Sequence, residues 1–111
     1  MFVFQKFSRL VNRKEFRNVF DSKKLKRFEG FIIFYCKNDI GYPRLGLAVS
    51  KKNVALAVHR NRIKRIIRES FRETELVAND YVVVVTHKIK YHSSKELRCR
   101  LDQAWLRFKK G

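Results

Sequence analysis

The spacing of apolar residues near the N-terminus predicts a short helix. Phe16, Val19 and Phe20 recur at intervals of three and four residues, which places them on one helical face. An Asn-x-x-Glu sequence beginning at Asn12 has the form of a capping box, in which both side chains accept hydrogen bonds from free backbone N–H groups. We therefore expect a helix over residues 13–22.

Two longer helices are predicted further along the chain. Residues 54–75 place apolar and basic side chains with helical periodicity. A second capping sequence, which begins at Ser93, introduces a helix over the last part of the chain. The apolar residues of this last helix share one face: Leu97, Leu101, Ala104, Trp105 and Phe108.

Runs of β-branched and aromatic residues predict the strands. Residues 31–36 and 81–86 have this composition, and residues 23–29 are expected to hold a brief edge strand. The turn-forming residues of segment 38–43 lead into residues 45–50. We expect residues 45–50 to return as the second strand of a hairpin with residues 31–36.

The predicted elements follow the order helix, strand, strand, strand, helix, strand, helix. In a chain of 111 residues this order is typical of a small α+β sandwich, with helices packed on one face of a sheet. The length suits one domain, which we expect to span residues 1–111.

The net charge of the chain indicates that it binds a partner of opposite charge. The chain contains 27 Lys and Arg against 10 Asp and Glu, a formal charge of +17 near neutral pH. Because such an excess of positive charge repels itself in a compact protein, we expect a polyanionic partner, with nucleic acid ranked before an anionic membrane surface.

The longest apolar run, residues 81–85, is far shorter than a membrane span, and no secretory signal pattern is visible, so a cytoplasmic location is expected. Cys36 and Cys99 lack metal-site spacing and are expected to be reduced thiols.

The positive charge is concentrated on one side of the helix predicted over residues 54–75. Six of the thirteen residues from Arg60 to Arg72 are Lys or Arg, and Glu69 is the one acid among them. A solvated surface helix usually mixes acids with bases, so this density favours nucleic-acid binding over a merely solvated face. At about 100° per residue, two opposing arcs separate. The apolar arc contains Ile63, Ile66, Ile67, Ser70 and Phe71, and the polar arc contains Asn61, Lys64, Arg65, Arg68 and Arg72, with Arg62 on its flank.

Aromatic residues form a second candidate site. Phe16 and Phe20 share a helical face, and Phe34 or Tyr35 lies on the first long strand. These rings could stack on nucleobases or could pack in the core, and residue types alone favour the core. Lys51 and Lys52 follow a strand, where phosphate contact and simple exposure are equally plausible.

No set of residues with catalytic spacing is found. The acids lack the close pairs that would hold two metal ions, and His59, His87 and His92 have no partner at ligand spacing. The chain also contains no glycine-rich phosphate loop and no nucleophile elbow. Any enzymatic activity would therefore need chemistry supplied by a partner.

Residues 60–72, preceded by residues 45–52, resemble the signature of the bacterial ribonuclease P protein component. The Arg-Asn-Arg sequence beginning at Arg60, with its Ile, Lys and Arg continuation, is the specific part of this likeness, which extends from about Arg9 to the final helix. Some members of the family have a glycine in a shorter link to this sequence, whereas residues 53–59 contain none. The likeness leaves open the role of the N-terminal aromatic residues Phe2, Phe4 and Phe7.

The resemblance implies a function that composition alone does not. Proteins of this family partner a large catalytic RNA, and together they remove the 5′ leader of precursor tRNA by Mg²⁺-dependent hydrolysis that leaves a 5′-phosphate. The RNA carries the active site and binds most of the Mg²⁺, so the resemblance assigns no catalytic residue and no metal ligand to the protein. It also implies a left-handed βαβ crossover around the basic helix, where the general rule favours a right-handed one.

The resemblance also assigns binding residues. The residues implied to contact the catalytic RNA are Arg60, Asn61, Arg62, Lys64, Arg65 and Arg68. The residues implied to bind the single-stranded leader of precursor tRNA are Phe16, Phe20, Phe34, Lys51 and Lys52. No membrane or DNA partner is expected. The alternative function is that of a non-enzymatic RNA-binding protein of the ribosomal type, or an RNA chaperone.

Overall fold

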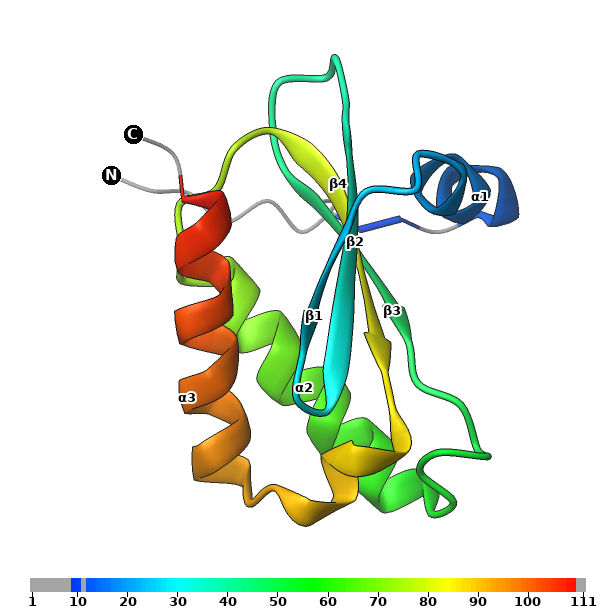
Figure 1. Cartoon of the computed structure of the whole chain (residues 1–111), viewed down its shortest axis with the longest axis vertical. Helices are drawn as coiled ribbons and strands as arrows, with labels where there is room; N and C mark the ends of the chain where they lie inside the picture. Colours follow the sequence, from blue (N-terminus) through cyan, green and yellow to red (C-terminus); the bar gives the residue numbers. More distant parts are fainter. Residues whose placement is uncertain (1–8, 11, 110–111) are drawn as a thin grey trace.

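The computed structural model describes residues 9–10 and 12–109, and its elements follow the predicted order (Figure 1). The helices are α1 (Arg13–Asp21), α2 (Ala57–Arg72) and α3 (Ser94–Trp105). The strands are β1 (Leu25–Phe28), β2 (Phe31–Lys37), β3 (Arg44–Ala48) and β4 (Asn79–Val85). Single 3-10 turns, His87–Tyr91 and Leu106–Phe108, follow β4 and α3. The aromatic residues Phe2, Phe4 and Phe7 lie outside the described residues.

The four strands form one mixed sheet with the order β1-β2-β4-β3. β4 lies between β2, to which it is antiparallel, and β3, to which it is parallel. The predicted hairpin between β2 and β3 is therefore wrong, and Leu45 of β3 pairs instead with Tyr81 of β4. The physical reason is burial: Val82 and Val83 face opposite sides of the sheet and both are fully buried. A strand that is apolar on both faces is most stable in the middle of a sheet.

The parallel pair β3 and β4 is joined by a crossover that contains α2. In Figure 1 both strands run down the page, β4 lies to the left of β3, and α2 passes behind the lower part of the sheet. This arrangement is left-handed, as the family resemblance implies. The general preference, which is right-handed in about 98% of such connections, does not hold here.

Helices cover both faces of the sheet. α2 and α3 pack on one face, and α1 packs on the other (Figure 1). The prediction that the helices share one face is wrong, because β2 and β4 are apolar on both sides. Ile33 and Val83 face α2 and α3, whereas Phe34 and Val82 face α1.

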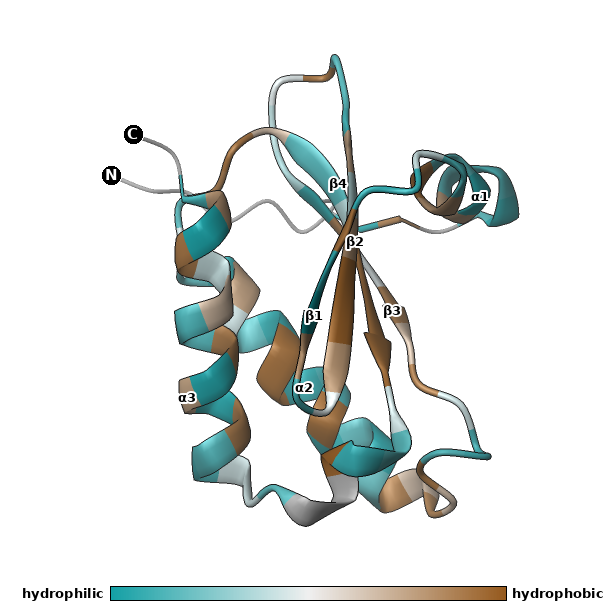
Figure 2. Ribbon diagram, viewed as in Figure 1, coloured by the Kyte–Doolittle hydropathy of each residue, from teal (hydrophilic) through white to brown (hydrophobic). Residues whose placement is uncertain are grey.

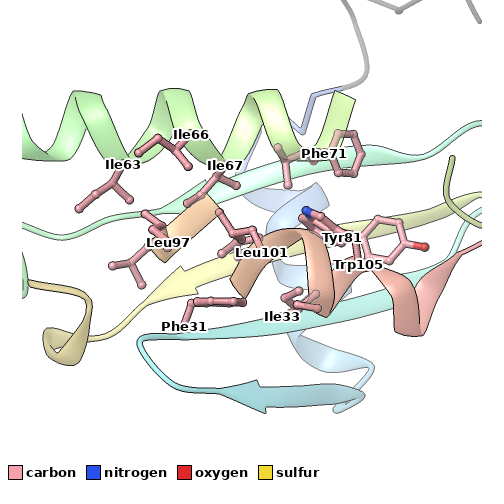
Figure 3. Packing of buried hydrophobic residues seen from close by; sticks show 14 of the residues in the cluster. Phe31, Ile33, Ile63, Ile66, Ile67, Phe71, Tyr81, Leu97, Leu101 and Trp105 are labelled. Carbon is pink, nitrogen blue, oxygen red and sulfur yellow. The ribbon is translucent and has the colours of Figure 1, made fainter. Parts of the chain in front are cut away.

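The larger core lies between the sheet and the pair α2 and α3 (Figure 3). The apolar side chains of α2 point toward the sheet (Figure 3), and hydrophobic and hydrophilic residues alternate along this helix (Figure 2). All five residues of the predicted apolar arc are buried: Ile63, Ile66, Ile67, Ser70 and Phe71. The predicted face of the last helix is buried as well, and the ring of Trp105 meets that of Tyr81 edge to face, with centroids 5.7 Å apart.

Polar contacts fasten α3 to the last turns of α2. The Ser70 hydroxyl donates to Asp102 Oδ1 at 2.5 Å. Arg98 donates to the same carboxylate at 3.0 Å and to Glu73 Oε1 at 2.5 Å. The two helices are therefore held together by an ion-pair network at the edge of their apolar interface.

α2 begins at Ala57, later than the predicted start at residue 54. The backbone N–H of Val54 donates to the carbonyl of Ser50 at 3.0 Å, which closes a turn. The side-chain amide of Asn53 donates to the carbonyl of Val85 at 3.0 Å. The link without glycine therefore forms a turn that is fastened to β4 before the helix starts.

No helix among residues 9–10 and 12–109 has the length and the apolar content needed to cross a membrane.

Replacing Ile67 by Ala should lower the free energy of unfolding by about 2–5 kcal/mol, since a buried aliphatic side chain would be lost and a cavity left behind. Ile67 is 1% exposed, whereas Val58, on the same helix, is 69% exposed. Val58→Ala is thus the control, and it should change the stability by less than about 0.5 kcal/mol. Urea unfolding followed by circular dichroism measures both. Equal losses would contradict the assignment of the apolar arc to the core.

Candidate nucleic-acid interface

The outer side of α2 presents a row of polar and basic side chains, which we call the basic face: Asn61, Lys64, Arg65, Arg68 and Arg72. Lys64 is half-buried and the other four are exposed. The buried isoleucines on the opposite side of the helix hold this face outward, as the helical periodicity predicts. From Arg60 to Arg72 the helix extends about 18 Å.

Three cations of the basic face, Lys64, Arg65 and Arg68, are not neutralised within the described part of the chain. Lys64, Arg65 and Arg68 form no ion pair with a carboxylate there. Two acids beside the helix pair, Glu73 and Asp102, are already engaged, since both accept hydrogen bonds from Arg98. An external anion is therefore the natural source of compensation.

Arg60 and Arg62 lie at the margins of the basic face and have internal hydrogen bonds. Arg60 is half-buried, and its guanidinium donates to the carbonyl oxygens of Val54 at 2.9 Å and Ala55 at 2.7 Å. Arg62 donates to the hydroxyl of Ser94, the first residue of α3, at 2.6 Å. Both arginines therefore help to hold the start of α2 in place, in addition to any contact with RNA.

The aromatic candidates gather on the other face of the sheet, beside α1. The rings of Phe20 and Phe34 meet edge to face with centroids 4.9 Å apart. Phe16 and Phe34 are half-buried, and Phe20 is 36% exposed. Tyr35 lies on the opposite face against Phe108. Of the two strand residues, it is thus Phe34 that joins the α1 aromatics.

A shallow groove runs along α1, lined by Asn12, Arg13, Phe16, Arg17 and Phe20. Arg13 and Arg17 are both exposed. Sequence reasoning did not single out these two arginines, although their spacing of four residues around Phe16 places them on a neighbouring part of the helix surface. The groove thus combines partly exposed rings with two positive charges.

Lys51 and Lys52 are exposed and lie in the turn that follows β3. This turn connects the strand beside α1 to the start of α2. The two lysines therefore lie along the chain between the aromatic groove and the basic face.

The described residues contain no group of three or more His, Cys, Asp or Glu side chains that could hold a metal ion. His59 and His87 are exposed, whereas His92 is buried with Nε2 3.4 Å from Glu29 Oε1. Burial raises the pKa of the Cys36 thiol, which disfavours the nucleophilic thiolate. What the arrangement offers is therefore binding: arginines for phosphates and rings for bases.

Comparison with known proteins identifies the family. The ribonuclease P family model matches residues 4–109. The ribonuclease P protein component of Legionella pneumophila (strain Lens) is 42% identical over 105 residues, which cover 95% of this chain and 92% of that protein. The chain belongs to the ribonuclease P protein family. As a ribonuclease P protein component, it is part of the ribonuclease P complex and acts in tRNA processing.

Solved structures of ribonuclease P proteins share the fold. The protein from Staphylococcus aureus superimposes with a TM-score of 0.84 at 30% identity, covering 92% of this chain and 94% of that chain. The protein from Thermotoga maritima gives a TM-score of 0.79 at 29% identity, covering 92% and 98%. The α+β fold predicted from the sequence and the family resemblance are both confirmed.

Replacing Arg65 or Arg68 by Ala should weaken RNA binding and lower the magnitude of the slope of log K against log salt concentration by about 0.7–0.9. The reason is that fewer counterions are released from the RNA when one phosphate contact is missing. Arg107→Ala is the control, because it removes an exposed arginine outside α2. Filter binding to the catalytic RNA over a range of salt concentrations measures the slope. An unchanged slope for both α2 variants would mean that these side chains are merely solvated.

Proposed function

We propose that this ribonuclease P protein binds the catalytic RNA through the basic face of α2 and the 5′ leader of precursor tRNA through the groove beside α1. The RNA would carry the active site, and the protein would assist removal of the leader in the cytoplasm. The observation that carries the proposal is the uncompensated charge of Lys64, Arg65 and Arg68 on a helix whose opposite side is fixed in the core.

The chemistry of the basic face suits an RNA backbone. Arginine outnumbers lysine in this segment, and a planar guanidinium can donate two parallel hydrogen bonds to one phosphate. A row of such groups on a rigid helix can follow a run of phosphates with little loss of backbone entropy on binding. We assign the six residues Arg60, Asn61, Arg62, Lys64, Arg65 and Arg68 to this contact, with Arg60 and Arg62 at its margins.

The groove beside α1 suits an unpaired strand. Single-stranded RNA exposes the faces of its bases, and aromatic side chains bind them by stacking with little dependence on sequence. Phe16, Phe20 and Phe34 present partly exposed rings, and Arg13 and Arg17 supply charge for the phosphates. This tolerance matches the task, since leaders of different precursors differ in sequence. Lys51 and Lys52 would add charge along the path toward α2.

We assign the Mg²⁺ requirement to the RNA. The described carboxylates do not fit a resident Mg²⁺ site, because they form no cluster and several are held by arginines: Glu15 and Asp80 by Arg44, and Glu73 and Asp102 by Arg98. The chemistry that Mg²⁺ would supply, when held by the RNA, is that of a Lewis acid for hydrolysis. The protein would contribute by neutralising phosphates and by holding the leader.

Cleavage of a precursor tRNA at physiological Mg²⁺ should require both this protein and a bacterial ribonuclease P RNA. Combining the two should release a leader and leave a 5′-phosphate on the tRNA, as measured with end-labelled substrate on a denaturing gel. Each component alone is the control. Efficient cleavage by the isolated protein would contradict the assignment of the active site to the RNA. If adding the protein does not change cleavage by the RNA, the proposed function is wrong.

Phe16→Ala should weaken binding of a leader-bearing precursor to the holoenzyme by about 5- to 150-fold, since one stacked base is worth about 1–3 kcal/mol. Binding of mature tRNA should stay unchanged. Tyr42→Ala is the control, because Tyr42 is an aromatic residue that is 39% exposed on the β2–β3 loop, away from the groove. An equal loss of affinity for precursor and mature tRNA would mean that Phe16 has a purely structural role.

A further inference from the structure

β3 presents a distinct set of side chains to α1. Alternate residues of a strand face opposite sides of the sheet. Leu45 and Leu47 pack into the larger core under α2 and α3. Arg44 and Gly46 face the other way and meet α1 at two consecutive residues, Glu15 and Phe16.

Arg44 ties the first turn of α1 to the parallel pair of strands. Its guanidinium donates to both carboxylate oxygens of Asp80 on β4, at 2.9 and 2.8 Å, and to Glu15 Oε2 on α1 at 2.8 Å. Glu15 also closes the capping box, because its Oε1 accepts from the backbone N–H of Asn12 at 3.3 Å. One carboxylate therefore caps α1 and connects it to the sheet.

The contact is shielded from solvent and geometrically demanding. The side chain of Arg44 is 20% exposed and that of Asp80 is 8% exposed. Hydrogen bonding to Asp80 raises the pKa of Arg44, which therefore stays charged. Nε, Nη1 and Nη2 of the guanidinium are all directed at carboxylates of the protein itself. Arg44 is thus a structural arginine, in contrast to Arg65 and Arg68 of the basic face.

Gly46 sets the distance between α1 and the strand. A Cβ atom placed on Gly46 would lie 2.7 Å from both Cε1 and Cζ of Phe16, and 3.2 Å from Cδ1 of Leu10. The Phe16 ring therefore rests directly against the backbone of β3. The backbone angle φ of Gly46 is not positive, so the requirement for glycine here is one of space.

Other contacts hold the C-terminal end of α1 to β2: the Ser22 hydroxyl donates to the carbonyl of Tyr35 at 2.9 Å, and the Phe20 ring meets that of Phe34. Val19 is the one residue of this helix that is fully buried. The core on this face is small, with three buried members among the described residues: Leu10, Val19 and Val82. The polar contact at Glu15 and the close approach at Phe16 position the N-terminal part of α1 against β3.

We propose that Arg44 and Gly46 are positioning residues for leader recognition, which fix the height and angle at which α1 presents Phe16 to the leader. Arg44 acts through Glu15, and Gly46 acts by leaving room for the Phe16 ring. The proposal rests on the proposed function of the groove. It adds two residues of β3 that need not touch RNA.

A double-mutant cycle on Gly46 and Phe16 tests the steric part. Holoenzymes carrying Gly46→Ala, Phe16→Ala or both are compared for their affinity for leader-bearing precursor and for mature tRNA. Gly46→Ala should reduce the preference for the leader on the order of fivefold or more, comparable to loss of one stacked ring. In the double variant, Gly46→Ala should cause no further loss of leader preference, because the Phe16 ring that it would displace is already absent.

Gly41→Ala provides a matched control. Gly41 has φ of 87° and nothing within 4 Å of a Cβ, so alanine there strains the backbone without touching α1. Gly41→Ala should leave the leader preference intact, which separates a local effect at α1 from general destabilisation. A leader preference that is intact in Gly46→Ala, or reduced equally in both backgrounds, would overturn the steric part. If Phe16→Ala alone has no effect on leader preference, the proposal that the groove beside α1 binds the leader is wrong.

Glu15→Gln tests the polar part while keeping the fold. Glutamine also serves in a capping box, so α1 keeps its cap, and the Arg44–Asp80 pair is left in place. Losing the charged contact should reduce leader preference on the order of threefold to tenfold. The affinity for catalytic RNA and its salt slope should not change, since neither residue lies on the basic face. An unchanged leader preference, or a lowered salt slope, would overturn the role of Arg44 in positioning.

Discussion

The burial of β4 on both faces is the constraint from which the rest of the structure follows. A strand with apolar residues on both sides must lie between two other strands and beneath two layers of side chains. β4 therefore separates β2 from β3, and its parallel pairing with β3 requires the α2 crossover. The same two-sided burial leaves α1 on one face and the pair α2 and α3 on the other. The aromatic groove and the basic face consequently belong to different layers of the protein.

Arginines of this chain occur in two contrasting physical situations. Arg44 and Arg98 each bond two carboxylates and join separate elements of the fold. Arg65 and Arg68 have no acidic partner in the described part of the chain and face solvent. With few acids available, pairing them at structural positions leaves Arg65 and Arg68 without compensation. Part of the net charge of +17 therefore stays uncompensated on α2, where an external anion can balance it.

Local features of the fold could be predicted from the sequence, and long-range ones could not. The capping box at Asn12 and the apolar arc of α2 depend on residues a few positions apart, and both predictions are confirmed. The partner of β3 depends on competition among all strands for burial, which a pattern of hydrophobic residues in one segment does not encode. For the same reason the position of α1 was predicted on the wrong face. The left-handed crossover was expected from the family resemblance alone, because local rules favour the opposite hand.

The candidate site shows the same division. Periodicity was sufficient to separate the basic face from the core, because both lie on one helix. It could not choose between Phe34 and Tyr35, since that choice depends on which face of the sheet α1 covers. Gly46 is the clearest case: in sequence it is a glycine inside a strand, where glycine usually weakens the structure. Its significance comes from the ring of Phe16, thirty positions earlier, resting where a side chain would be. A residue that acts by leaving space has no pattern of its own, and only the packing of α1 against β3 reveals it.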